Sequence, residues 1–132
     1  MTLTANRLGQ IDLVAVPVAD QDRAIDFYVS VLGFEKRTDI PFGNGYRWVE
    51  VYPPSGPTGI ALAPPPPDSD ETAGKSTGII ISTDDIDAAH AELKDAGADV
   101  DAEVSRMGDP VPPMFWFRDP EGNSLLVVEP QR

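Results

Sequence analysis

The sequence predicts an α+β fold of two tandem βαβββ modules that form a curved mixed sheet with a concave cleft. Turn residues repeat at a spacing of 66 positions, in the pairs Pro54 and Pro120, Gly56 and Gly122, and Pro64 and Pro130. The order strand, acidic cap, helix and glycine also occurs once in each half. A chain of 132 residues can bury one core but not two independent ones. We therefore expect one domain over 1–132, with modules at about 8–64 and 76–130 and a Pro-rich linker at 64–75.

The first module begins with LGQIDLVAVPV, an apolar segment with β-branched residues that is typical of a strand buried on both faces. Asp20 is placed to cap the helix ADQDRAIDFYVSVL, which Gly33 ends. FEKRT is the next expected strand and DIPFGNG a Gly/Pro-rich loop. The aromatic strand YRWVEVY then leads through the turn PPSG into the last strand of the module.

The second module repeats this order. STGIIIST is the expected first strand, Asp84 or Asp85 the cap, and DIDAAHAELKDAG the helix. The strand ADVDAEV, the loop RMGDPVPP and the aromatic strand MFWFRD follow, and the turn DPEG enters the last strand. The four prolines of the linker PPPPDSDETAGK favour an extended spacer between the modules.

Composition limits the possible partners. The formal charge of −12 opposes a phosphate backbone, so nucleic acid is not an expected partner. The absence of cysteine removes disulfides, thiolate metal sites and a cysteine nucleophile together. No apolar run approaches the roughly 20 residues that cross a bilayer, and MTLTANRLGQ is unlike a signal peptide. We expect a cytoplasmic protein without membrane contact.

Three segments together resemble the vicinal oxygen chelate superfamily, which includes glyoxalase I, extradiol dioxygenases, fosfomycin-resistance enzymes and bleomycin-resistance proteins. They are IDLVAVPVADQDRAIDFYVSVLGFE in the first half, and STDDIDAAHAELKDAGADV and FRDPEGNSLLVVEP in the second. The similarity covers about residues 8–130 and is specific for the fold. It does not specify a function, because the superfamily spans unrelated chemistries.

The resemblance also implies where a metal ion would be bound. Metal-dependent members hold a divalent ion through one residue from the first and one from the last strand of each half, usually two histidines and two glutamates. Seven residues before the acidic cap stand Leu13 and Gly78, and four after the turn glycine stands Leu126, with Ile60 as its repeat partner. None of these side chains offers a lone pair to a metal, and shifting the positions by one residue assembles no ligand set. We therefore expect no metal and no cofactor.

An apolar cleft is expected where the metal would have been. Period-two alternation adds neighbours to the four positions, and the two Gly/Pro-rich loops supply a rim. The expected cleft residues are Leu13, Ile60, Leu62, Gly78, Ile80, Leu126 and Val128, with Phe42, Tyr46, Met107 and Met114 at the rim and Trp48 and Trp116 at matching strand positions behind it. Aromatic walls of this kind are common in small-molecule pockets, although the same residues could simply fill a core.

Other chemistry has little support in the sequence. The chain has no GxSxG elbow, phosphate loop or dinucleotide fingerprint, and its single histidine, His90, lies within the second expected helix. Glu50 shares a strand face with Trp48, and either lines the cavity or pairs with Arg47 or Arg118.

Three classes of function remain. One is a metal-free binding protein that sequesters a small, partly aromatic and conceivably cationic molecule, as bleomycin-resistance members do. Another is a glyoxalase-, lyase- or dioxygenase-type enzyme with an unrecognised metal site or none. A structural or regulatory module is the third. In each case the open sheet predicts a homodimer, because its edges and concave face need cover.

Overall fold

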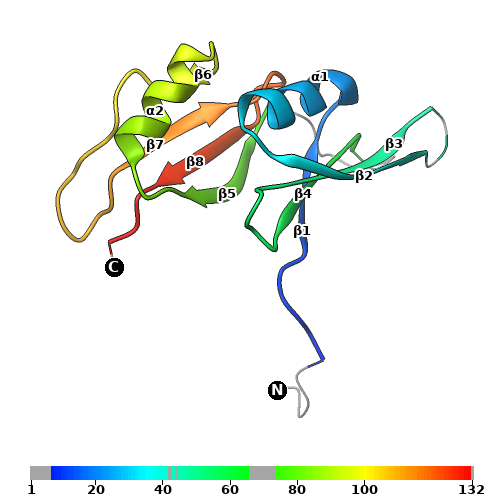
Figure 1. Ribbon diagram of the computed structural model, residues 1–132, viewed down its shortest axis with the longest axis horizontal. Coiled ribbons are helices and arrows are strands. Elements are labelled where there is room, and N and C mark those ends of the chain that lie inside the picture. Colours follow the sequence, from blue (N-terminus) through cyan, green and yellow to red (C-terminus); the bar gives the residue numbers. More distant parts are fainter. Residues whose placement is uncertain (1–6, 42, 44, 66–73, 132) are drawn as a thin grey trace.

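The computed structural model describes residues 7–41, 43, 45–65 and 74–131. Phe42 and the middle of the expected linker, 66–73, lie outside the described residues. Each half of the chain forms its own four-stranded sheet, and the two sheets lie side by side (Figure 1). The α+β fold of two βαβββ modules is confirmed, with the strands divided between two sheets that no strand pairing joins in the described part of the chain.

The first sheet has the order β1-β4-β3-β2. Its strands are β1 (Leu13–Pro17), β2 (Glu35–Pro41), β3 (Arg47–Tyr52) and β4 (Gly59–Ala63). Strand β1 runs parallel to β4, and the other neighbours are antiparallel. A register shift between Lys36 and Thr38 makes Arg37 a bulge residue of β2.

The second sheet repeats this arrangement in the order β5-β8-β7-β6. Its strands are β5 (Ser76–Ser82), β6 (Asp99–Val100), β7 (Met114–Arg118) and β8 (Ser124–Val128). Strand β5 runs parallel to β8, and β6 is shorter than the expected strand ADVDAEV. Both sheets therefore have two edge strands each, β1 and β2 in the first and β5 and β6 in the second.

The helices begin and end where the sequence predicts. Asp20 caps α1 (Gln21–Asp26) by accepting from the backbone N–H of Arg23, and the helix continues as a π-helical stretch, Phe27–Val31. Asp85, one of the two expected caps, serves α2 (Ile86–Asp95) through the N–H of Ala88. Caps of this kind stabilise a helix by about 1 kcal/mol. No helix among the described residues is long and apolar enough to span a membrane.

Both helices lie on the same side of the two sheets (Figure 1). Between helices and sheets lies one apolar core to which both modules contribute. It contains Val16, Val49, Val51, Ile60 and Leu62 of the first sheet, Phe115, Phe117, Leu125 and Val127 of the second, and Ala24, Phe27, Tyr28 and Ile86 of the helical segments. The opposite face of each sheet carries no helix, and we call these surfaces the open faces.

The modules are fastened together at one end. The turn Asp119–Asn123 of the second module docks on the start of α1 through five hydrogen bonds. The Glu121 carboxylate accepts from the N–H groups of Ala19 and Asp20, Tyr28 Oη donates to Asp119 (3.0 Å), Asn123 Nδ2 donates to the carbonyl of Pro17, and Arg23 donates to the carbonyl of Pro120. Burial and the neighbouring Asp119 carboxylate raise the pKa of Tyr28, so this residue is a permanent donor to Asp119.

Candidate functional site

Strand register decides which predicted cleft residues share a face. Ala15 pairs with Ala61 in the first sheet, and Ile80 pairs with Leu126 in the second. Each residue of the second pair stands 65 positions after its counterpart, one fewer than the spacing of the turns. The strand positions that match Leu126 and Trp116 are therefore Ala61 and Glu50.

This offset corrects part of the expected cleft. Ile60 and Leu62 point to the helix side, where they are 5% and 0% exposed and belong to the core. The prediction that they line the cleft with Leu13 is wrong, because a shift of one residue moves a strand side chain to the other face. Trp48 and Trp116 do not hold matching positions either, because Trp116 pairs with Leu126 whereas Glu50 pairs with Ala61.

The open face of the first sheet carries a carboxylate held by two aromatic side chains. Trp48, Glu50 and Tyr52 alternate along β3 and lie on one face of the strand. Trp48 Nε1 donates to Glu50 Oε2 at 2.7 Å, and Tyr52 Oη donates to Glu50 Oε1 at 2.9 Å. One interpretation of the sequence was that Glu50 pairs with Arg47 or Arg118. The structure shows Glu50 bonded to Trp48 and Tyr52 instead. The hydrogen bond to Glu50 raises the pKa of Tyr52, and burial and the charges of Glu50 and Asp12 raise it further.

Small residues form the floor beside this carboxylate. Ala61 is the strand partner of Glu50, and Ala15 is the partner of Ala61 on the other side. Gly59 allows the ring of Tyr52 to lie across β4, because a Cβ at this position would stand only 2.6 Å from the ring. The side chains of this floor are therefore smaller than those at the matching places of the second sheet.

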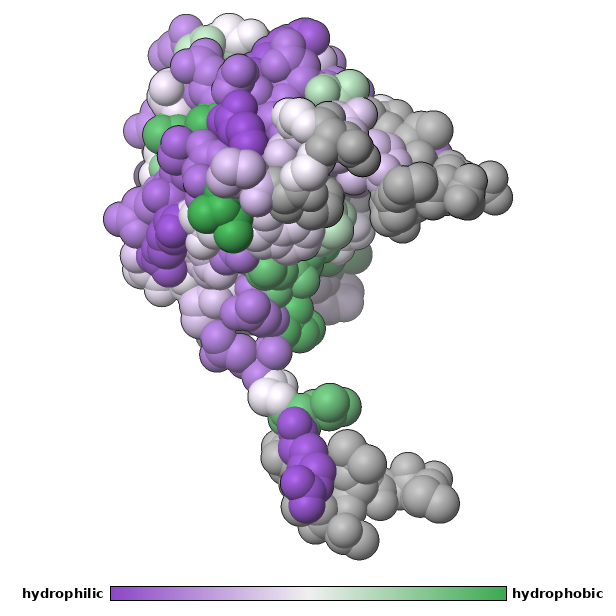
Figure 2. All heavy atoms as spheres, turned by 90° about the vertical axis from the view of Figure 1, so that its right-hand side faces the viewer, coloured by the Kyte–Doolittle hydropathy of each residue, from purple (hydrophilic) through white to green (hydrophobic). Residues whose placement is uncertain are grey.

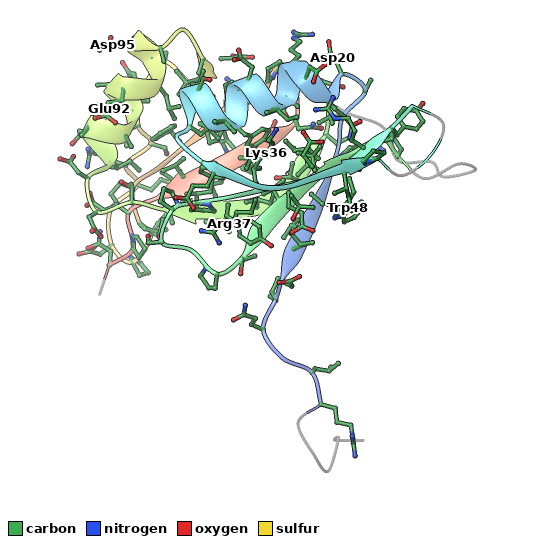
Figure 3. All side chains as sticks on the ribbon, turned by 45° about the vertical axis from the view of Figure 1, so that its right-hand side comes forward. Asp20, Lys36, Arg37, Trp48, Glu92 and Asp95 are labelled. Atoms are coloured by element: carbon green, nitrogen blue, oxygen red, sulfur yellow. The ribbon has the colours of Figure 1, made fainter. Side chains whose placement is uncertain are left out.

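A cation already lies on the ring of Tyr52. The Arg37 guanidinium stands 4.4 Å from the ring centroid, within the range of a cation–π contact. Arg37 also pairs with Glu35 at 2.9 Å. Arg37 and Trp48 both lie below the first sheet, away from α1 (Figure 3). The sequence did not indicate Arg37, because its orientation depends on the bulge in β2.

The open face of the second sheet is apolar and aromatic. Ile80, Leu126 and Trp116 stand side by side on β5, β8 and β7, and Ile80 and Trp116 are 63% and 37% exposed. Val128 pairs with Met114 in the next row, whereas Gly78, with a φ of 74°, lies in the irregular part of β5 between Ser76 and Ile80. The structure thus places Ile80, Met114, Trp116, Leu126 and Val128 on one face of the second sheet, and their role as the lining of a binding cleft stays a prediction.

Other expected rim residues have different surroundings. Arg118 is engaged by Asp99 and Asp101 at 3.0 Å each, and the bond to Asp99 is the main cause of its raised pKa. Tyr46 and Met107 are exposed on the segments before β3 and β7, at 44% and 69%. Seen from the hairpin of β2 and β3, apolar surface gathers on the lower part of the body, away from the helices (Figure 2).

The positions implied for a metal ion carry no ligand atoms. After the correction of register they are Leu13, Ala61, Gly78 and Leu126, and none has a side-chain nitrogen or oxygen. Among the described residues no three histidine or acidic side chains are grouped as a metal site. His90 is half-buried, and its Nε2 contacts the carbonyl of Asp101 while its ring packs against Phe115. The side chains present do not fit the divalent ion of metal-dependent proteins.

A pocket of about 450 Å³ opens between the modules at the end opposite the docked turn. Val14, Phe34 and Ile60 of the first module face Ile79 and Ile81 of the second, and the turn at 53–59 closes one side. Among the residues that the structure describes, no charged side chain lines this pocket. Ser55, Thr58 and Ser82 add hydroxyl groups to its apolar walls, whereas the first open face carries the Glu50 carboxylate.

Comparisons with known proteins agree with this geometry. The sequence pattern of the Glyoxalase/Bleomycin resistance protein/Dioxygenase superfamily matches residues 10–127. The uncharacterized protein YurT of Bacillus subtilis is 30% identical over 91% of this chain and 98% of its own. TnmS3, an antibiotic binding protein from Streptomyces sp. CB03234, has a TM-score of 0.79 at 33% identity and covers 95% of this chain and 98% of its own. A superfamily member from Sphaerobacter thermophilus has a TM-score of 0.84 at 36% identity over 92% and 98%.

Proposed function

The chain belongs to the Glyoxalase/Bleomycin resistance protein/Dioxygenase superfamily, and from this premise we propose that it binds and sequesters a small, partly aromatic molecule. The binding surface is formed by the two open faces, and binding requires no metal ion. The protein acts in the cytoplasm, and its role resembles that of the antibiotic binding protein TnmS3.

One observation carries the proposal. Trp116, Ile80 and Leu126 form an apolar row on the second open face, where Ile80 and Trp116 are 63% and 37% exposed and Leu126 between them is 9% exposed. Apolar side chains gathered in this way are typical of surfaces that bind a ligand or a partner. The indole ring of Trp116 is suited to stacking on a flat aromatic molecule.

The missing ligand atoms favour binding over metal-dependent turnover. Leu13, Ala61, Gly78 and Leu126 leave no carboxylate or imidazole where related enzymes hold their ion. An enzyme of the superfamily would have to use other groups of the open faces. The same measurements can test this alternative, because an enzyme would convert the molecule that it binds.

Acridone, a neutral planar aromatic molecule, is a suitable first probe. We expect it to quench tryptophan fluorescence saturably, without added metal and unchanged by EDTA. Trp116→Ala should weaken binding about tenfold, as expected for an exposed aromatic anchor. Leu8→Ala is the matched control, because Leu8 is an exposed apolar residue, 72% accessible, outside both sheets.

Two results would contradict the proposal. One is saturable binding by neither acridone nor a panel of aromatic antibiotics. The other is EDTA-sensitive isomerisation of the methylglyoxal–glutathione adduct, which would assign the protein to the enzymes of the superfamily.

We further propose that the protein is a homodimer. The exposed side chains of Ile40, Ile80 and Trp116 and the edge strands β1 and β5 are features that a second copy would cover. Closed two-fold pairing is the commonest way in which a small protein covers such surfaces.

A further inference from the structure

The arginines on the strands of the two sheets pair with carboxylates other than that of Glu50. Arg37 pairs with Glu35, Arg47 with Asp22 and Asp39, and Arg118 with Asp99 and Asp101. Glu50 takes part in none of the ion pairs found in the described part of the chain, although it is half-buried. A carboxylate in such a position is costly unless hydrogen bonds or a cation compensate it.

Hydrogen bonds fix this carboxylate without using all of its acceptor capacity. Each oxygen of Glu50 accepts one bond, from Trp48 Nε1 at 2.7 Å and from Tyr52 Oη at 2.9 Å. A carboxylate has about four acceptor sites, so room for further donors is left on both oxygens. Because Trp48 and Tyr52 hold it from two sides, the carboxylate needs little reorganisation to accept a further donor.

The surroundings favour a cationic donor. The π-face of Tyr52 already attracts the guanidinium of Arg37, which demonstrates that a positive group fits on this face. Beside Glu50 the floor consists of small residues: Gly59 lies under the ring of Tyr52, Ala61 is buried, and Ala15 is exposed. The matching place on the second sheet is filled by Ile80, Leu126 and Trp116. One open face thus offers a negative charge and the other an apolar wall.

We infer that Glu50 is the anchor for a positively charged group of the ligand. The proposed function then concerns a particular chemical class, namely molecules with a flat aromatic or apolar body and a protonated amine or a guanidinium. Glu50 binds the cation, Trp48 and Tyr52 position the carboxylate, and the second open face binds the body. This inference rests on the proposed function.

Two probes that differ in charge test it. 9-Aminoacridine is a planar cation at neutral pH, and acridone has a similar neutral ring system. We expect the parent protein to bind the cation about tenfold or more tightly, the gain expected from one charge-assisted contact. Glu50→Gln should remove that gain and change acridone binding less than about twofold.

The matched control is Glu92→Gln. Glu92 is exposed on α2, on the helix side of the molecule, so this variant loses the same net charge away from the open faces (Figure 3). It should bind both probes as the parent does. Equal weakening by Glu50→Gln and Glu92→Gln would overturn the inference, because the overall negative charge would then explain the attraction.

Further outcomes separate the inference from the proposed function. If the parent binds acridone and 9-aminoacridine equally, the inference fails and the proposed function stands. If it binds neither, both fail. Should Glu50→Gln not fold, the parent alone decides the question when the salt concentration is raised from about 20 to 500 mM. A half-buried contact keeps most of the preference for 9-aminoacridine over acridone, whereas an attraction between exposed charges is screened and the preference is lost.

Discussion

Gly59 is the residue on which the shape of the first open face depends most directly. The ring of Tyr52 lies over it so closely that an added Cβ would stand 2.6 Å from a ring carbon. That ring position brings the Tyr52 hydroxyl to Glu50 and its π-face to Arg37. Both contacts therefore depend on the absence of a side chain at Gly59.

Gly59→Ala should displace the ring of Tyr52 and weaken its bond to Glu50. We expect a loss of about 1–3 kcal/mol in unfolding free energy from overpacking, measured by urea denaturation. Binding of 9-aminoacridine should fall more than binding of acridone. The control is Gly9→Ala, where an added Cβ meets nothing within 4 Å. Equal stability of the two variants would contradict this role for Gly59.

At the residue scale the sequence predicted a face of β4 that is wrong by one position, because Ile60 and Leu62 belong to the core. The turns and strand β3 repeat at 66 positions, as Glu50 and Trp116 show, but β1 and β4 repeat at 65, as Ala15 and Ile80 show. Counting 66 positions back from Leu126 gives Ile60, whereas the residue at the matching place in β4 is Ala61, which is 65 positions back. Sequence alone could not settle this, because both faces of β4 carry apolar residues and period-two alternation gives no signal there.

At the element scale, strands β2 and β3 are joined on the helix side by a chain of ion pairs. Asp39 accepts from Arg47 Nε at 2.9 Å and from Lys36 Nζ at 2.9 Å, and Arg47 also reaches Asp22 on α1 at 2.7 Å. These contacts lower the pKa of Asp39 to about 2, with the bond from Arg47 as the largest cause. The chain of charges connects the hairpin to α1.

Acid should weaken this connection in a defined pH window. Because the folded-state pKa of Asp39 lies below its ordinary value of 3.8, its contribution to stability is complete above about pH 4 and is lost as the pH falls towards 2. Asp39→Asn should therefore melt below the parent at pH 6, and the difference should shrink at pH 2.5. Glu103→Gln, at an exposed site, is the control. A difference in melting temperature that does not change with pH would contradict the assignment.

Secondary structure was predictable where local chemistry decides it. Two helix starts are marked by capping bonds to Asp20 and Asp85, and one helix end is marked by the positive φ of Gly33. Caps and glycine stops of this kind can be inferred from sequence. Strand β6 was overestimated because Asp101 bonds the N–H of Trp116 with its side chain, at 3.1 Å, so that the expected ladder ends early. A competing side-chain bond of this kind leaves no periodic signal.

At the scale of the whole molecule, exposed apolar groups predict self-association. Light scattering should give a mass of twice 14.2 kDa, because Ile80, Trp116 and the edge strands need cover. Trp116→Ala should shift the equilibrium towards the single chain if this face lies in the interface. A mass of one chain at every concentration would exclude the dimer.

How the modules join was beyond prediction from sequence. DPEGN was identified as a turn, but its docking on α1 depends on Tyr28, Glu121 and Asn123 meeting groups about a hundred residues away. The corresponding turn of the first module, at 53–58, has proline, serine and glycine where carboxylates and an amide would be needed. No hydrogen bond among the described residues joins that turn to the second module.

The docked turn therefore fastens the two modules at one end, and a pocket lies between them near 53–59 at the other end. Rotation about the fixed end, at Asp119–Asn123, would change the pocket near 53–59 while leaving both sheets intact. A ligand that contacts both open faces would then favour one angle between the modules. Binding would then change the distance between the two modules and leave the content of helix and strand unaltered.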